Sequence, residues 1–406
     1  MNFDKFTFHP QINAGISTAG YKTPTPIQEQ AMPAILSGKD VLGLAQTGTG
    51  KTAAFVLPLL QRLMKGQRGK LRALIIAPTR ELAEQTHAFI LLLGKQTGLR
   101  SLTVYGGVSA KPQIRGLQAG VDIVVACPGR LLDLKDQRQV DLSQVEMLVL
   151  DEADHMFDMG FLPAIRRIID ALPAKRQTLL FSATMPDEIR SLAKKILYNP
   201  VTVEIGIDEP IGTIRHAVYL ADSTQKLDML LRILGRTGDG QVLVFSRTKH
   251  RTKKLAYQLL QAGVSTTSLQ GNLSQPQREA AMNSFRKGKA KVMVATDIAA
   301  RGIDVSQVTH VINYDMPDTA EAYTHRTGRT GRMEHLGSAV SLVTQDDLPM
   351  LRTIERMMGQ TLELRKLSGI EATFVNSIQP AQPKPQRSRS SSSPKTHYRS
   401  YATNRR

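Results

Sequence analysis

The sequence has few of the residues that form disulfides and aromatic stacking surfaces. It contains one cysteine (Cys127), no tryptophan and only 5% aromatic residues among 406. A single cysteine excludes an intramolecular disulfide and fits a reducing compartment. So few aromatic side chains argue against a platform that stacks the bases of a single strand.

Long apolar segments are also missing. The apolar run at 88–93 is far shorter than the roughly 20 residues that span a membrane. The first residues, Met1-Asn2-Phe3-Asp4-Lys5, lack the apolar core of a signal peptide. We therefore expect a soluble, cytoplasmic protein.

Positive charge, in contrast, is in excess. The formal net charge is +18 and the pI is about 10.0, which predicts a polyanionic partner. Residues 380–406 carry seven Lys and Arg side chains, four prolines, a serine run and no acidic residue. With almost nothing apolar to bury, residues 376–406 are expected to form a disordered basic tail. This tail could bind polyanions nonspecifically or act only as a solubilising extension.

A chain of 406 residues can form two or three domains. Short apolar runs alternate with helical patterns, which predicts βαβ units around parallel sheets and an α/β fold class. A break near residue 205 predicts a linker at 206–213 between domains at 1–205 and 214–370. The expected strands are 40–45, 73–77, 101–104, 122–126, 147–150 and 178–181, then 216–220, 242–245, 292–295, 309–313 and 339–343.

A glycine-rich turn follows the first expected strand. It reads Ala45-Gln46-Thr47-Gly48-Thr49-Gly50-Lys51-Thr52 and is followed by apolar spacing that a helix could use. Backbone N–H groups of Gly48 and Gly50 could approach phosphate oxygens, with Lys51 as a cation and Thr52 as a hydroxyl for Mg²⁺. The alternative is a glycine-rich turn that contains a lysine by chance. We interpret the segment as a nucleoside triphosphate site.

An acidic segment follows the strand expected at 147–150. It reads Asp151-Glu152-Ala153-Asp154, and carboxylates at this position can hold Mg²⁺ beside the phosphates of a neighbouring loop. Glu152 could orient the attacking water. The structural alternative is an acidic helix N-cap.

Two further segments fit a nucleotide. Gln28 follows a proline-fixed turn, and its amide offers a donor and an acceptor to an adenine edge. The second half carries His325-Arg326-Thr327-Gly328-Arg329-Thr330-Gly331-Arg332, whose arginines could bind phosphate oxygens, although an exposed basic loop is the alternative. Two halves, one with a phosphate loop and one with arginines, predict a cleft that closes on ATP.

Over residues 1–370 these motifs, in this order and spacing, resemble those of the DEAD-box ATP-dependent RNA helicases, most closely the bacterial RhlE-like branch. The resemblance implies two tandem RecA-like parallel-sheet domains that close over ATP, Mg²⁺ and RNA. It implies a hydrolase that couples ATP binding and hydrolysis to local unwinding or remodelling of short RNA duplexes and ribonucleoproteins. It also implies a monomer that works with ribosomal-precursor or RNA-decay complexes.

The resemblance assigns ATP-site roles to individual residues. Catalysis would rest on Lys51, Asp151, Glu152 and the arginine fingers Arg329 and Arg332. Mg²⁺ would be held through water by Thr52 and Asp151. ATP would be bound by Phe3, Tyr21, Gln28, Gln46, Thr47, Gly48, Thr49, Gly50, Lys51, Thr52 and Asp304.

The resemblance also assigns contacts to the sugar-phosphate backbone of RNA. These are Pro78, Thr79, Arg80, Gly107, Pro128, Gly129 and Arg130 in the first half, and Arg247, Thr248, Gly271, Gln275, Arg278 and Thr296 in the second. Coupling between nucleotide and RNA would rest on Ser182, Thr184, Asp154, His325 and Arg326.

Two residues depart from the family pattern, and two other functions compete with it. Cys127 stands where the family usually has Thr, and Gln270 stands where His is common.

One alternative function is a DNA helicase on the same paired-domain fold, against which the Gln28 segment argues. The other is an RNA-binding or annealing module whose ATPase only times release.

Overall fold

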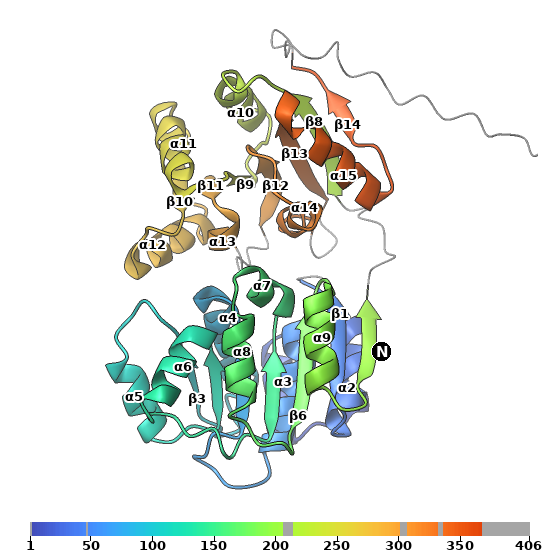
Figure 1. Cartoon of the computed structure of the whole chain (residues 1–406), viewed down its shortest axis with the longest axis vertical. Helices are drawn as coiled ribbons and strands as arrows, with labels where there is room; N and C mark the ends of the chain where they lie inside the picture. Colours follow the sequence, from blue (N-terminus) through green and yellow to red (C-terminus); the bar gives the residue numbers. More distant parts are fainter. Residues whose placement is uncertain (1, 46–47, 206–213, 301–306, 332–335, 368–406) are drawn as a thin grey trace, which may run out of the picture.

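The computed structural model describes residues 2–45, 48–205, 214–300, 307–331 and 336–367, and these form two α/β domains (Figure 1). Each domain contains a seven-stranded sheet in which all pairings between neighbouring strands are parallel. The predicted linker at 206–213 and the predicted tail at 376–406 lie outside the described residues.

The first domain begins with helices and then alternates strands with helices. Its elements are η1 (Phe3–Phe6), α1 (Pro10–Thr18), α2 (Pro26–Leu36), β1 (Val41–Ala45), α3 (Lys51–Leu63), β2 (Ala73–Ile76), α4 (Arg80–Leu93), β3 (Ser101–Val104), α5 (Lys111–Gln118), β4 (Ile123–Ala126), α6 (Pro128–Asp136), β5 (Met147–Leu150), α7 (Ala153–Asp158), α8 (Leu162–Ile169), β6 (Gln177–Ser182), α9 (Asp187–Ile196) and β7 (Val201–Ile205).

The second domain repeats the alternation. Its elements are β8 (Ile214–Leu220), α10 (Lys226–Leu234), β9 (Gln241–Phe245), α11 (Lys249–Gln261), β10 (Thr266–Leu269), α12 (Gln275–Arg286), β11 (Val292–Ala295), α13 (Asp297–Ala300), β12 (Val308–Asn313), α14 (Ala320–Thr327), β13 (Gly337–Val343), η2 (Gln345–Asp347), α15 (Leu348–Met358) and β14 (Glu363–Arg365).

The two sheets have the same strand order. The first is β3-β4-β2-β5-β6-β1-β7 and the second is β10-β11-β9-β12-β13-β8-β14, so every strand has a counterpart seven strands later. Ligands of open parallel sheets bind at the carboxyl ends of the strands. The loops after β1, β5 and β6 therefore lie on one rim of the first sheet, and those after β9, β11 and β12 on one rim of the second.

Core packing follows from the alternation of side chains along each strand. In β2, Ala73 and Ile75 belong to the apolar cluster on one face of the sheet, whereas Leu74 and Ile76 belong to the cluster on the other. All four side chains are fully buried, because helices cover both faces of a parallel sheet. The rigid sheet thus fixes the positions of the rim loops.

The eleven predicted strands are all present, within two residues at either end. Three further strands, β7, β10 and β14, were missed. All three lie at a sheet edge, where part of the backbone faces solvent and a continuous apolar run is not needed. Among the described residues, no helix is both long enough and apolar enough to cross a membrane.

Candidate functional site

The predicted phosphate loop joins β1 to α3. Gly48 and Gly50 both have a φ of 92°, a left-handed conformation that favours glycine, and Gly50 caps α3. Lys51 is the first residue of that helix and is buried, and its Nζ donates a hydrogen bond to the Ala45 carbonyl oxygen at 2.7 Å. The ammonium group therefore lies over the turn, at the positive end of a helix dipole, where an anion is favoured.

Gln28 connects α2 to this loop. Its Oε1 accepts from the Thr25 N–H at 3.0 Å, and its Nε2 donates to the Gly50 carbonyl oxygen at 3.1 Å. A Cβ at Gly50 would lie only 2.6 Å from that amide nitrogen, so the loop needs glycine for space as well as for conformation. Phe3 and Tyr21 stack beside this segment, with ring centroids 6.0 Å apart and planes at 19°. The residues predicted to hold the nucleotide therefore belong to connected segments.

Asp151 and Glu152 follow β5 and are both buried. Burial raises the pKa of Asp151 to about 7, although Lys51 acts in the opposite direction. Its Oδ1 is buried and has no hydrogen-bond partner among the described residues. Burial also acts to raise the pKa of Glu152, but His155, Arg329 and Lys51 outweigh it and hold that pKa well below its usual range. The pKa of Asp151 is thus raised, whereas its neighbour Glu152 is ionised.

Asp154 ties α7 to the loop after β6. Its Oδ2 accepts from the backbone N–H groups of Ala183 and Thr184 at 3.1 and 2.9 Å, and from the Thr184 hydroxyl at 3.1 Å. The Ser182 hydroxyl in turn accepts from the Asp154 N–H at 3.2 Å. The predicted coupling residues Asp154, Ser182 and Thr184 therefore form one network. The structural alternative for the acidic segment was a helix N-cap. Glu152 does occupy the N-cap position of α7, with a φ of 52°, but its side chain makes no capping hydrogen bond.

His155 was missed from the sequence, although it lies in the same buried site. Its Nδ1 is 2.8 Å from Glu152 Oε2, and its Nε2 is 3.3 Å from Nδ1 of His325 in the second domain. The two imidazoles meet edge to face, with centroids 4.6 Å apart and planes at 88°. The i,i+3 spacing from Glu152 on a helix was the available signal.

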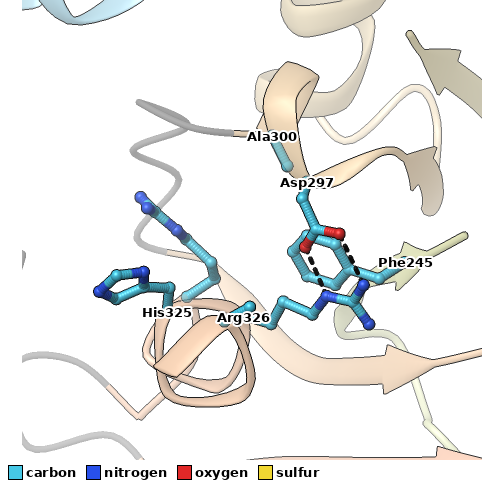
Figure 2. A pocket seen from close by; sticks show the side chains of 7 residues that line it. Phe245, Asp297, Ala300, His325 and Arg326 are labelled. Carbon is cyan, nitrogen blue, oxygen red and sulfur yellow. Dashed lines mark hydrogen bonds and ion pairs between the residues drawn. The ribbon is translucent and has the colours of Figure 1, made fainter. Parts of the chain in front are cut away.

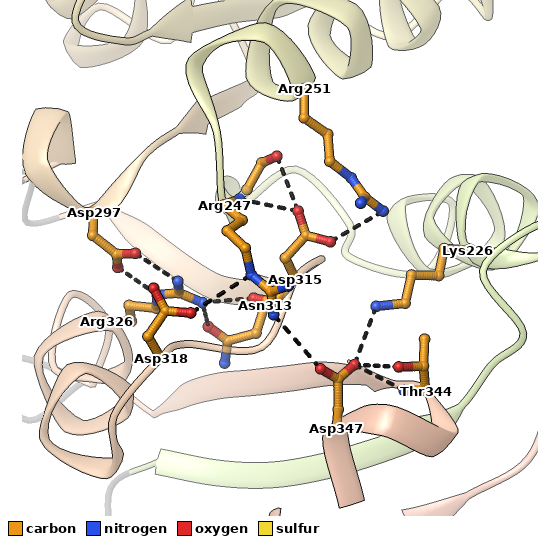
Figure 3. Close-up of polar contacts among 11 residues, drawn as sticks. Lys226, Arg247, Arg251, Asp297, Asn313, Asp315, Asp318, Arg326, Thr344 and Asp347 are labelled. Atoms are coloured by element: carbon orange, nitrogen blue, oxygen red, sulfur yellow. Dashed lines mark hydrogen bonds and ion pairs between the residues drawn. The ribbon is translucent and has the colours of Figure 1, made fainter. Parts of the chain in front are cut away.

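Arg326 fixes the helix that carries His325. It donates to both carboxylate oxygens of Asp297 at 2.5 and 2.6 Å, and to Asn313 Oδ1 and the Asp315 carbonyl oxygen at 3.0 and 2.7 Å. Its guanidinium lies 4.9 Å from the Phe245 ring centroid. Figure 2 shows the ion pair with Asp297 beside the Phe245 ring, and Figure 3 shows the same ion pair together with Asn313 and Asp315. The guanidinium group of Arg326 therefore makes these contacts within its own domain.

Arg329 lies just beyond α14 and is buried, and it lines a small pocket together with His325 and Arg326. Its positive charge acts on Glu152 across the domain boundary. The predicted site residues Gln46, Thr47, Asp304 and Arg332 lie outside the described residues.

The predicted RNA-contacting arginines Arg80 and Arg278 face each other's domain across a cleft of about 310 Å³ between α4 and α12. Arg80 pairs with Glu279 at 2.7 Å, and Arg278 pairs with Glu81 at 2.7 Å. Arg80 also stacks on Tyr105, with 4.2 Å from its guanidinium carbon to the ring centroid. Each domain thus supplies one arginine and one glutamate to a pair of crossed ion pairs. Neither ion pair between the domains was predicted from the sequence.

Three predicted RNA contacts begin helices. Thr79 Oγ1 caps α4 by accepting from the Leu82 N–H, and Thr248 Oγ1 caps α11 by accepting from the Arg251 N–H, both at 3.2 Å. Gln275 is the first residue of α12. All three stand at helix N-termini on the rims, where free backbone N–H groups can bind an anion.

Two other predicted contacts are arginines held by their own domain. Arg130 donates to the Val108 carbonyl oxygen at 3.1 Å. The side chain of Arg247 approaches Asp318 and Asp347 at 3.6 and 3.7 Å (Figure 3). The remaining predicted contacts follow strands or begin α6: Pro78, Gly107, Pro128, Gly129, Gly271 and Thr296.

The two departures from the family pattern have local structural roles. Cys127 is the residue before α6, and burial raises the pKa of its thiol to about 12, so it is not a reactive thiolate. Gln270 is buried, and its Oε1 accepts from the Asn272 N–H at 2.6 Å, which shapes the turn after β10.

Comparison with known proteins shows which family the chain belongs to. The DEAD/DEAH box helicase model matches residues 25–192, and the helicase conserved C-terminal domain model matches residues 225–334. The chain is 43% identical over 369 residues to the RNA helicase CrhR of Synechocystis sp., covering 90% of this chain and 75% of that protein. It is 40% identical to the ATP-dependent RNA helicase CshA of Listeria monocytogenes, covering 93% and 73%.

Among solved structures, Dbp5 of S. cerevisiae bound to RNA and ADP BeF3 superposes with a TM-score of 0.83 at 32% identity, covering 90% of this chain and 95% of that one. Mss116p bound to ssRNA and AMP-PNP gives 0.80 at 27% identity, covering 90% and 79%. The family models, the relatives and the paired RecA-like sheets all indicate the same family. The chain belongs to the DEAD-box ATP-dependent RNA helicases.

Proposed function

We propose that ATP is hydrolysed between the two domains and that their closure strains one RNA strand locally, which opens short duplexes or remodels ribonucleoproteins. The observation that carries this proposal is the contact of the acidic segment with the second domain. Glu152, through His155, and Asp154 both lie against His325, while Arg329 acts on Glu152. A catalytic site completed by both domains can act only when they are together.

In this proposal the residues of the first domain bind ATP and activate water. Lys51 and the N–H groups of the turn hold the phosphates, and Gln28 binds the adenine. Ionised Glu152 accepts the proton of the attacking water or orients it for in-line attack. Arg329, with Arg332, neutralises charge on the transferring phosphoryl group.

The site also fits Mg²⁺. Among the described residues no cluster of three His, Cys, Asp or Glu side chains could hold a metal by itself. Mg²⁺ typically combines one or two carboxylates with water and substrate phosphates. Asp151 has a buried oxygen without a partner and a raised pKa, both of which a cation would relieve. Asp151 and Thr52 would hold the ion, which would supply charge neutralisation at the phosphates.

RNA would cross the rims of both sheets through its sugar-phosphate backbone. The proposed contacts are mostly helix starts, glycine turns and arginines, which suit recognition of phosphate and ribose without base sequence. We infer a monomer that meets ATP and RNA in the cytoplasm. Assignment to the RhlE-like branch, and to ribosomal-precursor or RNA-decay complexes, stays a prediction, since the relatives named above carry other names.

The experiment that tests the proposal compares nucleic acids. ATP turnover should rise strongly with single-stranded RNA and little with DNA of the same sequence, because 2′-hydroxyls distinguish the two. A short RNA duplex should separate only with ATP. Equal stimulation by DNA would favour the DNA-helicase alternative.

The basic tail gives a separate prediction. Deleting residues 380–406 removes seven cations and no acid, so RNA affinity should fall and its dependence on salt should flatten. ATP turnover at saturating RNA should change little. The measurement is RNA binding at several salt concentrations, with unwinding measured in parallel. Loss of unwinding at intact ATP turnover would favour the annealing-module alternative, and unchanged affinity would leave the tail a spacer.

A further inference from the structure

The helix α11 carries a basic face that is open to solvent. The helix follows β9 at the rim of the second sheet, so it starts directly after Arg247 and Thr248, two proposed RNA contacts. Figure 1 shows α11 at the edge of the second domain, beside β10. One side of the helix packs on the sheet through its buried residues, which are Thr252, Leu255, Ala256 and Leu259. The opposite side therefore faces solvent.

This solvent face combines cations with one aromatic ring. Lys253 and Lys254 are exposed and lie four and three residues before Tyr257, the spacing at which side chains are neighbours on a helix surface. Tyr257 is 62% exposed, and Leu260, nearly one turn further, is 51% exposed. The face thus presents a tyrosine ring flanked by two ammonium groups.

The charge of these two lysines is not balanced within the protein. Among the described residues, neither Lys253 nor Lys254 has a hydrogen-bond or ion-pair partner. Arg251, on the same helix, does pair with Asp315 at 3.1 Å (Figure 3). The helix itself contains no Asp or Glu. The two ammonium groups are therefore available to an anion from outside the chain.

The matching helix of the first domain shows that the fold does not require this charge. The helix α4 follows β2, which has the place of β9 in the repeated strand order. After Arg80 it carries Glu81 and Glu84 and no lysine. A merely solvated helix face typically mixes charges of both signs, whereas α11 carries one sign alone. A polyanionic partner accounts for this difference.

We propose that the face formed by Lys253, Lys254 and Tyr257 binds a segment of single-stranded RNA that continues past the contacts at Arg247 and Thr248. The ammonium groups bind phosphates and the phenol ring stacks on one base, a combination that holds single strands without regard to sequence. A helix rises about 1.5 Å per residue, so this face lies about 8 to 14 Å beyond Thr248 along the helix axis. Only RNA that extends past Arg247 and Thr248 can use it. The inference rests on the proposed function, since it takes these two residues as RNA contacts.

The test compares the binding of two single-stranded RNAs to the full chain. One is the shortest RNA that fully stimulates ATP turnover, and the other is the same RNA with an unstructured extension at each end. The double variant Lys253→Gln, Lys254→Gln should lower affinity for the extended RNA by about 3- to 10-fold and its salt slope by about one to two. Affinity for the short RNA, and ATP turnover at saturating RNA, should not change.

Two further variants separate stacking from charge. Tyr257→Ala should lower affinity for the extended RNA by about 5- to 10-fold without changing its salt dependence, whereas Tyr257→Phe keeps the ring and should bind like the wild type. The matched control is Lys194→Gln, Lys195→Gln, which alters two adjacent exposed lysines near the end of α9 in the first domain. This control should leave both affinities unchanged.

Four results would contradict these expectations. Unchanged affinity of the α11 lysine variant for the extended RNA would overturn the proposal, as would an equal loss with both RNAs or in the α9 variant, since these indicate only general attraction. Polyglutamate, measured in parallel, is the probe for an acidic protein. If the α11 lysine variant loses affinity for polyglutamate alone, the face binds a protein instead of RNA. A wild type whose ATP turnover no RNA stimulates would instead overturn the proposed function.

Discussion

Arg329→Ala is expected to lower RNA-stimulated ATP turnover by about 10³- to 10⁵-fold, the range that an arginine finger contributes to phosphoryl transfer. Arg329 is buried at the domain boundary, and its charge acts on Glu152 of the other domain. Because Lys51, Gln28 and Thr52 all belong to the first domain, nucleotide binding should largely survive. The measurement is single-turnover hydrolysis at saturating ATP and RNA, with nucleotide affinity determined separately.

Two controls make this result specific. Arg329→Lys keeps the charge but loses the planar fork that contacts two phosphate oxygens, so most of the loss should remain. Arg352→Ala removes an exposed arginine of the same domain and should leave turnover unchanged. Wild-type turnover in Arg329→Ala would exclude this residue from the transition state and remove the main support for a catalytic site shared by both domains.

Glu152→Gln should arrest the reaction at a different stage. The amide has the shape of the carboxylate but cannot act as a base, so hydrolysis should fall by about 10²- to 10⁴-fold. Its carbonyl oxygen can still accept from His155 Nδ1, so the contact with His325 is retained. With ATP bound and unhydrolysed, the domains should stay together and RNA should dissociate slowly.

RNA dissociation in the presence of ATP compares the two variants directly. We expect slow release from Glu152→Gln and fast release from Arg329→Ala, which loses a contact to the phosphates. Glu204→Gln, which alters an exposed glutamate of β7, should release RNA at the wild-type rate. Equal rates for Glu152→Gln and Arg329→Ala would mean that the second domain does not sense the nucleotide.

The fold could be predicted from the sequence wherever a buried strand is also a run of hydrophobic residues. Central strands such as β5 are buried on both faces and read as continuous apolar runs, which places Asp151 at a strand end. The edge strand β14 has three exposed residues and leaves no such trace. Its position depends on pairing with β8, a contact between segments far apart in the chain.

The candidate site divides in the same way. Lys51 and Asp151 lie in short local motifs whose residue types indicate phosphate and metal binding, so both residues could be predicted from the sequence. His155 and Glu279 gain their roles from partners in the other domain, His325 and Arg80, and no local pattern reports such a contact. The anchoring role of Arg326, which binds Asp297 at the start of α13, likewise needed the fold.

The crossed ion pairs between α4 and α12 bear on how strongly salt controls RNA binding. Arg80 and Arg278 are proposed to bind phosphates, yet both are already neutralised by Glu279 and Glu81. RNA that binds these arginines as proposed would replace each carboxylate by a phosphate, and the freed carboxylates would attract cations from solution. That uptake would offset the counterions released from RNA, so the salt dependence of RNA binding should be shallower than the number of arginine contacts would give. If RNA binds these arginines as proposed, this cleft would exchange one counterion for another, and contacts elsewhere would supply most of the net affinity for RNA.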